Sequence, residues 1–182
     1  MDNIFDDNYF DITIEATEYK RNNVQGVNEV YKSLNKQDRL FVQGGNYRKN
    51  SRDYLIDPEG DFATKFINND YGFMITMYVD NKPAAYFGCF RAWDKHKKQY
   101  TDEAEIDFAV HSDYRGKGLG SKIIKKGMDE IKRNPKYKTI KWYTLVDNEA
   151  SNALAKKFGF RYFETITSHD KHNKLNGYIY EK

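Results

Sequence analysis

The stretch that decides the fold is Glu105-Ile-Asp-Phe-Ala-Val-His-Ser-Asp-Tyr-Arg-Gly-Lys-Gly-Leu-Gly-Ser121. In its first half, apolar side chains recur at every second position, at Ile106, Phe108 and Val110, which predicts a strand. After the glycines, apolar residues recur at helical spacing: Leu119, Ile123, Ile124, Met128 and Ile131. The predicted order is therefore strand, tight turn, helix.

Three glycines occupy alternate positions between the predicted strand and the predicted helix: Gly116, Gly118 and Gly120. Because glycine has no Cβ, its backbone N–H can approach a ligand closely and its φ can be positive. The first turn of a helix also has N–H donors without internal partners, and the helix dipole adds positive character there. Together these features predict a phosphate-binding loop.

Two common phosphate-binding patterns do not fit this loop. A Walker loop places lysine and then Ser or Thr directly after its last glycine, whereas Ser121 and Lys122 occur in the reverse order. The dinucleotide pattern Gly-x-Gly-x-x-Gly also fails, because its third glycine would be Ser121 or Ile123. The spacing that does occur is Arg115-x-x-Gly118-x-Gly120.

This loop, together with the preceding strand that ends at Val110, resembles the pyrophosphate loop of the GNAT superfamily of N-acetyltransferases, which bind acetyl-coenzyme A (acetyl-CoA). A second block resembles a later helix of the same family and the Gly-Phe that closes it. It consists of Asn148-x-x-Ser151, then Leu154, then Phe158-Gly159-Phe160. The resemblance extends over about residues 103–165, with both blocks in the order that the family has.

The resemblance implies an α/β (α+β) fold, with a mixed, mostly antiparallel sheet flanked by helices and a central parallel strand–helix–strand unit. That unit agrees with the residues, because the helix from Leu119 must end before Pro135 and a β-rich stretch follows at 139–146. At 182 residues, the chain is expected to form a single domain over residues 1–182.

The other elements are predicted from periodicity and turn residues. Strands are expected at 10–16, 73–79, 84–93, 160–166 and 178–181, and helices at 24–34 and 62–68. The helix after Asn148 is expected to bury Ala150, Ala153, Leu154 and Phe158. The lysine-rich segment 94–98 is interpreted as a solvated hairpin tip, because so short a cluster makes no extended basic surface.

The resemblance also implies which residues bind the cofactor. The backbone of Phe108 and Val110 pairs with the pantetheine arm, Asn148 hydrogen-bonds it, and Ser151 lies close by. The loop residues implied at the pyrophosphate are Arg115, Gly116, Lys117, Gly118, Leu119, Gly120 and Ser121.

N-acetyl transfer requires a group that takes a proton from the acceptor amine, because an ammonium group has no lone pair. Glu105 is the candidate for this catalytic role, since many relatives carry a glutamate ten residues before the Arg115 position. Glu103 and Asp107 share its predicted strand face, and such a cluster also suits a cationic acceptor.

The group that protonates the leaving thiolate is open. Relatives often have a tyrosine seven residues after the Asn148 position, but this chain has Ala155 there. Tyr143, Tyr162 or water are the alternatives. The departure also leaves room for a domain that binds the cofactor without efficient turnover.

Composition limits the other possibilities. The single cysteine, Cys89, excludes an internal disulfide and favours a reducing, cytoplasmic location. No apolar run is long enough to span a membrane. His169 and His172 stand in a polar loop without a third ligand nearby, so no metal is expected. Residues 114–182 carry 16 Lys and Arg against 7 Asp and Glu, and this charge is interpreted in part as a field for an anionic cofactor.

The sequence therefore predicts an acetyl-CoA-dependent N-acetyltransferase that acts on a primary amine of a small molecule or peptide, by direct attack in a ternary complex. One alternative is a non-catalytic CoA-binding sensor or partner domain. Another is an acyltransferase for aminoacyl-tRNA or a ribosomal protein. Nucleic acid is not an expected partner, because residues 1–113 are acidic overall. The oligomeric state stays open, with a homodimer as one option.

Overall fold

The structure is a computed structural model that describes residues 17–36, 38, 71–168 and 171–182. The strand expected at 10–16 and the helix expected at 62–68 lie outside the described residues. Among the described residues, no helix has the length and apolar character needed to cross a membrane.

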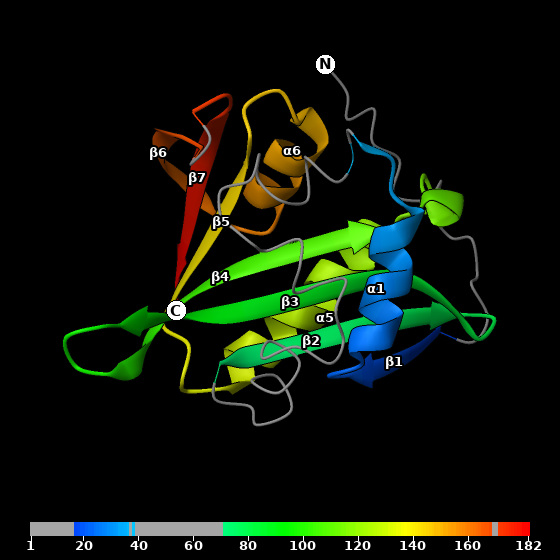
Figure 1. The fold of residues 1–182 in the computed structure, drawn as a ribbon, viewed down its shortest axis with the longest axis horizontal. Coiled ribbons are helices and arrows are strands. Elements are labelled where there is room, and N and C mark those ends of the chain that lie inside the picture. The colour runs from blue at the N-terminus through cyan, green and yellow to red at the C-terminus, as the bar shows by residue number, and fades with distance from the viewer. Residues whose placement is uncertain (1–16, 37, 39–70, 169–170) are drawn as a thin grey trace, which may run out of the picture.

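The described chain forms one seven-stranded sheet with the strand order β1-β2-β3-β4-β5-β7-β6 (Figure 1). The elements in chain order are β1 Thr17–Arg21, α1 Val24–Ser33, β2 Gly72–Val79, β3 Lys82–Asp94, β4 Gln99–Val110, the 3₁₀ turn η2 Ser112–Tyr114, α5 Leu119–Arg133, β5 Thr139–Leu145, α6 Glu149–Lys157, β6 Arg161–Thr167 and β7 Lys174–Glu181. The pairing of β4 with β5 is parallel, and the other described pairs are antiparallel. This confirms the predicted fold class.

Helices cover both faces of the sheet and produce two apolar clusters. On one face, α1 packs its Val27, Val30 and Tyr31 against Met74, Tyr86 and neighbouring residues of the sheet. On the other face, α5 packs its apolar stripe against β2, β3 and β4, and Ala155 of α6 joins the same cluster. Burial of these side chains supplies the main stabilisation of the fold.

The central parallel strands separate soon after they begin to pair. Their register joins only Glu103–Glu105 to Thr139–Lys141. β4 then continues to Val110, whereas β5 leads away toward α6, and the two strands visibly diverge in Figure 1. The last part of β4 therefore has β3 on one side and no strand of the described chain on the other.

Many element boundaries agree with the sequence, but strand β1 was not predicted and β7 begins four residues before the predicted 178. The predicted stripe of α6 was partly right, since Leu154 and Phe158 pack against the core. Ala150 and Ala153 are exposed, whereas Ser151 and Ala155 are the buried residues of this helix. The Ser151 hydroxyl accepts a buried hydrogen bond from Trp142, and Ala155 packs in the apolar core, so this face of α6 lies against the sheet. The hairpin turn is also tighter than expected, with Asp80 and Asn81 alone between β2 and β3 and both at positive φ.

Gly127 lies where α5 packs tightly on the sheet. A Cβ at this position would lie 2.3–2.5 Å from ring carbons of Phe87, which is fully buried. At Gly120 of the same helix, a Cβ would make only ordinary contacts, at 3.8 Å to Val110 and 3.9 Å to Leu154.

This difference predicts opposite effects of the same substitution. Gly127→Ala should destabilise the fold by about 1–3 kcal/mol, because the core must shift to accept the methyl group. Gly120→Ala should be neutral or stabilising by up to about 1 kcal/mol, because alanine favours helix. Urea unfolding measures both, and equal effects of the two variants would contradict the close packing of α5 on Phe87.

Candidate active site

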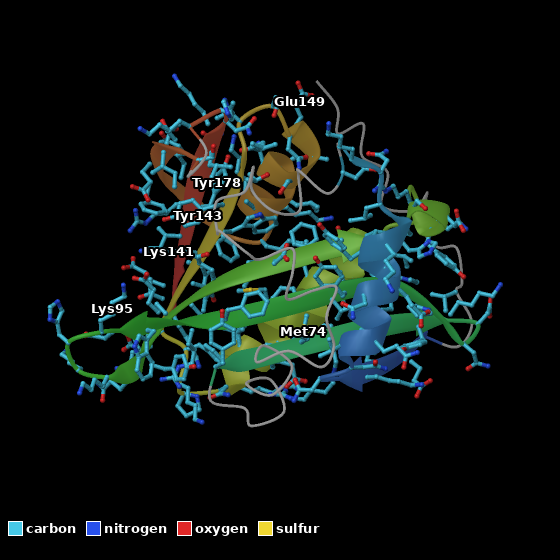
Figure 2. The ribbon with its side chains drawn as sticks, in the orientation of Figure 1. Met74, Lys95, Lys141, Tyr143, Glu149 and Tyr178 are labelled. Carbon is cyan, nitrogen blue, oxygen red and sulfur yellow. The ribbon has the colours of Figure 1, made fainter. Side chains whose placement is uncertain are left out.

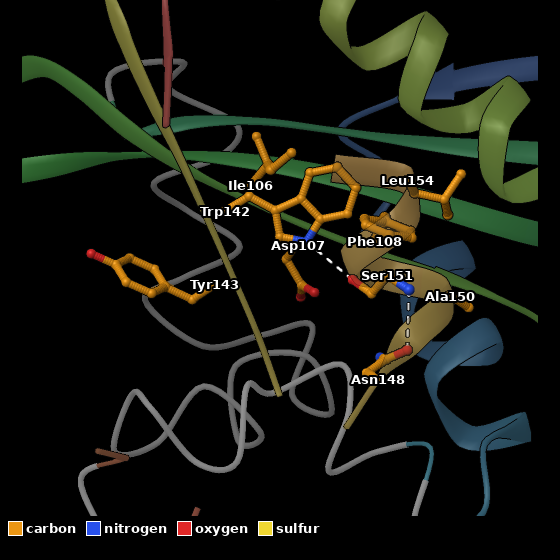
Figure 3. A pocket seen from close by; sticks show the side chains of 9 residues that line it. All are labelled: Ile106, Asp107, Phe108, Trp142, Tyr143, Asn148, Ala150, Ser151 and Leu154. Carbon is orange, nitrogen blue, oxygen red and sulfur yellow. Dashed lines mark hydrogen bonds between the residues drawn. The ribbon is translucent and has the colours of Figure 1, made fainter. Parts of the chain in front are cut away.

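A pocket opens where β4 and β5 separate, and α6 closes one side of it (Figure 3). Its volume is about 150 Å³. Its lining comes from β4, β5 and the start of α6: Ile106, Asp107, Phe108, Trp142, Tyr143, Asn148, Ala150, Ser151 and Leu154. The lining combines apolar walls with a few polar groups, which is typical of small-molecule sites.

The backbone of β4 offers hydrogen-bonding groups to this opening. The His111 N–H donates to the Ala84 carbonyl of β3 at 2.8 Å, which fixes the direction of the alternating amides along β4. Because successive amides of a strand point to opposite sides, the N–H groups of Phe108 and Val110 face the side that β5 has left. These two residues thus lie on the open edge of β4.

The glycine loop lies directly after this edge. Gly116 and Gly118 both have left-handed backbones, with φ of 73° and 72°, and Gly118 is the N-cap of α5. A Cβ at Gly116 would meet no heavy atom within 4 Å, so the outer side of the loop is open. The first-turn amides of α5 begin at Leu119, where the cap contributes no side-chain hydrogen bond. The loop therefore has the backbone geometry of an anion seat.

The cationic side chains of the loop have protein partners. Arg115 forms an ion pair of 2.8 Å with Asp38, and Lys117 Nζ lies 5.3 Å from the centre of the Tyr114 ring. His111 Nδ1 accepts the Asp113 N–H at 3.2 Å and so caps the turn η2. These contacts stabilise the turn between β4 and α5. The contact that His111 makes is therefore a structural one.

Asn148 and Ser151 are both in the pocket wall. Asn148 Oδ1 accepts the Ser151 N–H at 3.2 Å and caps α6, which leaves its side-chain N–H₂ group available to donate. The Ser151 hydroxyl accepts from Trp142 Nε1 at 3.2 Å, and the Trp142 ring packs edge-on against Phe108 at 5.0 Å. Trp142 thus connects β4, β5 and α6 at the pocket.

The three carboxylates predicted on one face of β4 have different surroundings. Glu103 forms an ion pair of 2.8 Å with Lys141 of β5. Glu105 is at the last paired position of β4, opposite Lys141, and is partly buried. Asp107 lines the pocket and accepts a hydrogen bond of 3.1 Å from the Tyr86 hydroxyl.

Tyr86 lies beneath this carboxylate and is fully buried. Burial, and then the negative charge of Asp107, raise the pKa of the Tyr86 hydroxyl well above its usual value. The hydroxyl therefore remains protonated and donates to Asp107 at any physiological pH.

Neither tyrosine that the sequence suggested as a proton donor presents its hydroxyl to the pocket. Tyr143 lies along the wall, but its hydroxyl donates to Glu164 at 2.8 Å and points away from Asp107 and Ser151 in Figure 3. Tyr162 is exposed, and its hydroxyl is 2.9 Å from that of Thr165. Ala155 is fully buried in the core and does not line the pocket.

The comparison with known families identifies the arrangement. Residues 29–160 match the Acetyltransferase (GNAT) family. The chain belongs to the GNAT acetyltransferases. Members of this family use acetyl-CoA as the acetyl donor.

Solved structures of acetyltransferases share the fold at low sequence identity. A GNAT acetyltransferase from Streptococcus pneumoniae is 14% identical, with a TM-score of 0.68 over 91% of this chain and 99% of its own. A Salmonella typhimurium acetyltransferase that modifies the N-terminal serine of ribosomal protein L7/L12 is 17% identical, with a TM-score of 0.64 over 94% and 98%. An aminoglycoside acetyltransferase in complex with coenzyme A is 16% identical, with a TM-score of 0.64 over 92% and 95%.

The pocket and loop fit acetyl-CoA on two observations of this chain. The open edge of β4 can pair with an amide-bearing arm, and the left-handed glycine loop can receive a pyrophosphate. The sequence singled out both features, together with Asn148 and Ser151. It missed Trp142 and the pairing of Tyr86 with Asp107, because both depend on contacts between separate elements. In the described part of the chain, no three His, Cys, Asp or Glu side chains gather as metal ligands.

We expect Gly118→Asp to abolish the rise in melting temperature that acetyl-CoA gives the native protein, because the carboxylate would stand at the proposed phosphate seat. Gly118→Asn is the matched control, since asparagine tolerates positive φ and has nearly the same size without the charge. Differential scanning fluorimetry compares the two. A full thermal shift in folded Gly118→Asp protein would contradict the assignment of the loop.

Proposed function

We propose that this GNAT protein transfers an acetyl group from acetyl-CoA to a primary amine of a small molecule or peptide, by direct attack within a ternary complex. One observation carries the proposal. The carboxylates and the open edge follow one another along β4, and the glycine loop comes after β4 and the turn η2, before α5. A donor seated on the loop and the edge would therefore bring its reactive end toward the carboxylates.

The proposed cofactor contacts are those implied by the sequence, and the geometry supports them. The edge amides of Phe108 and Val110 hold the pantetheine arm, Asn148 donates to it, and Ser151 supports Trp142 beside it. The loop amides bind the pyrophosphate. When bound, acetyl-CoA supplies the acyl group and a thiolate leaving group.

Glu105 is the proposed proton acceptor for the amine. It stands at the last paired position of β4, immediately before the edge opens, and alternation places its side chain on the same sheet face as Asp107. Glu105 is partly buried and stands opposite Lys141 of β5. A general base must lie within hydrogen-bond reach of the proton that it takes, and the start of the open edge is where this proposal places the amine.

We propose that Glu105→Gln lowers kcat/KM by about 10²–10⁴, the usual contribution of general-base catalysis. Affinity for acetyl-CoA should change little, because the glycine loop lies beyond the opposite end of the open edge. Glu103→Gln is the matched control, since Glu103 already pairs with Lys141. If Glu105 only attracts a cationic acceptor, KM for the amine will rise while kcat stays nearly constant.

A second candidate function is coenzyme A binding without efficient turnover. Two observations favour it: Ala155 carries no hydroxyl, and the Tyr143 hydroxyl is directed toward Glu164. This candidate predicts a clear thermal shift with acetyl-CoA and no acetyl transfer.

A thiol-release assay with acetyl-CoA separates the two functions. The acceptors should include polyamines, amino acids, peptides with N-terminal serine and aminoglycosides. The last two classes are chosen because one structurally similar enzyme modifies the N-terminal serine of a ribosomal protein and another is an aminoglycoside acetyltransferase. We expect release of coenzyme A above the hydrolysis rate with at least one amine. Tight acetyl-CoA binding with no release across the panel would support the binding domain instead.

A further inference from the structure

One end of the molecule carries positive charge that acetyl transfer does not use. The turn between β3 and β4 protrudes from the body of the protein, and Figure 2 shows Lys95 at its tip. Lys97 and Lys98 belong to the same turn, and all three lysines are exposed. By itself this cluster is a short charged turn, as the sequence indicates.

The fold extends this cluster with residues that are distant in the sequence. Lys136 and Lys138, from the loop between α5 and β5, line one cavity of about 450 Å³ together with Arg91 and Lys97. We call the six cations of this region the basic end: Arg91, Lys95, Lys97, Lys98, Lys136 and Lys138. Two carboxylates face them, since Asp94 is 4.0 Å from Lys97 and Asp102 is 3.3 Å from Lys138. The basic end therefore keeps an excess of positive charge.

This charge is too far from the glycine loop to serve the cofactor. The basic end lies past the C-terminal end of α5, and the loop lies at its N-terminal end. The 15 residues of α5 extend about 22 Å. That is more than twice the screening length of about 8 Å at physiological ionic strength. Lys136 and Lys138 belong to the basic segment 114–182 that the sequence suggests attracts an anionic cofactor. In the structure, these two lysines lie at the end of α5 opposite the glycine loop.

An exposed aromatic platform accompanies the lysines. The Trp93 side chain is 50% exposed although it is large and apolar, and its ring packs edge-on against Tyr100 at 4.9 Å. Arg91 lies 5.7 Å from the Tyr100 ring and donates to the carbonyls of Tyr100 and Thr101 at 3.0 and 2.7 Å. Tyr100 lines the cavity, and the exposed Trp93 ring is attached to this region through its contact with Tyr100.

We propose that the basic end binds single-stranded nucleic acid, with its lysines at the phosphates and Trp93 stacked on a base. Lysine ammonium groups on flexible stems suit successive phosphates, and an exposed indole offers a stacking face to any base. An acidic protein segment would satisfy the lysines but would leave the Trp93 platform without a matching group. This inference concerns binding alone, and it does not depend on acetyl transfer.

Intrinsic fluorescence provides a direct test on the full chain. The protein has two tryptophans, and Trp142 is 2% exposed, so a change in emission on titration reports Trp93. The probes are an oligouridine of about 12 nucleotides, which is within the usual site sizes, and a polyglutamate of equal charge. We expect quenching by the RNA and none by polyglutamate. Equal quenching by polyglutamate, or no binding of RNA at about 50 mM salt, would overturn the proposal.

Charge variants test the lysine contacts by anisotropy of labelled RNA. For single strands, log K falls with log salt by about 0.7 for each neutralised phosphate, so Lys136→Gln with Lys138→Gln should flatten the slope by about 1.4. Trp93→Ala should weaken binding about fivefold or more without changing the slope. The matched control removes Lys20 and Lys82, which are exposed outside the basic end. An equal change of slope in this control would show diffuse attraction and contradict the site.

Discussion

The separation of β4 from β5 is the constraint on which the rest of the molecule depends. The two strands pair over only three residues each, and β4 then continues without a strand of the described residues along one side. Backbone N–H groups are strong hydrogen-bond donors, and an unpaired strand edge can form hydrogen bonds with another extended chain. In a GNAT acetyltransferase, the pantetheine arm of acetyl-CoA suits that role. The open edge is thus the part of the fold that we propose as the binding site for this arm.

Several contacts keep this edge open and oriented. Trp142 points from β5 to Ser151 of α6 and packs on Phe108 of β4, so the three elements are braced at a fixed separation. Gly127 lets α5 lie close to Phe87, and this packing sets where α5 begins and hence where the glycine loop stands. Packing of the core and placement of the proposed phosphate seat are therefore coupled, and the core residues Ile106 and Trp142 also line the pocket.

The sequence predicted what local patterns encode. Strand alternation, the glycine loop and the stripe of α5 lie within one continuous stretch, so the order strand, turn, helix followed from residues 105–131. The fold class followed from the family resemblance over about residues 103–165. Contacts between distant segments were not accessible. Ala150 and Ala153 were wrongly placed in the buried stripe of α6, because periodicity does not reveal that Ser151 hydrogen-bonds Trp142. The link from Tyr86 to Asp107, and the gathering of Lys136 and Lys138 beside Arg91, also arise only when the sheet is assembled.

Residue-resolved amide hydrogen exchange with and without coenzyme A tests the central claim most directly. The amides of Phe108 and Val110 face the open edge, whereas those of Asp107 and Ala109 face β3. Binding along the edge predicts selective slowing of exchange at Phe108 and Val110, beyond the slowing that general stabilisation gives to their neighbours. If saturating coenzyme A slows exchange equally at all four amides, or at none of them, the result will contradict this account.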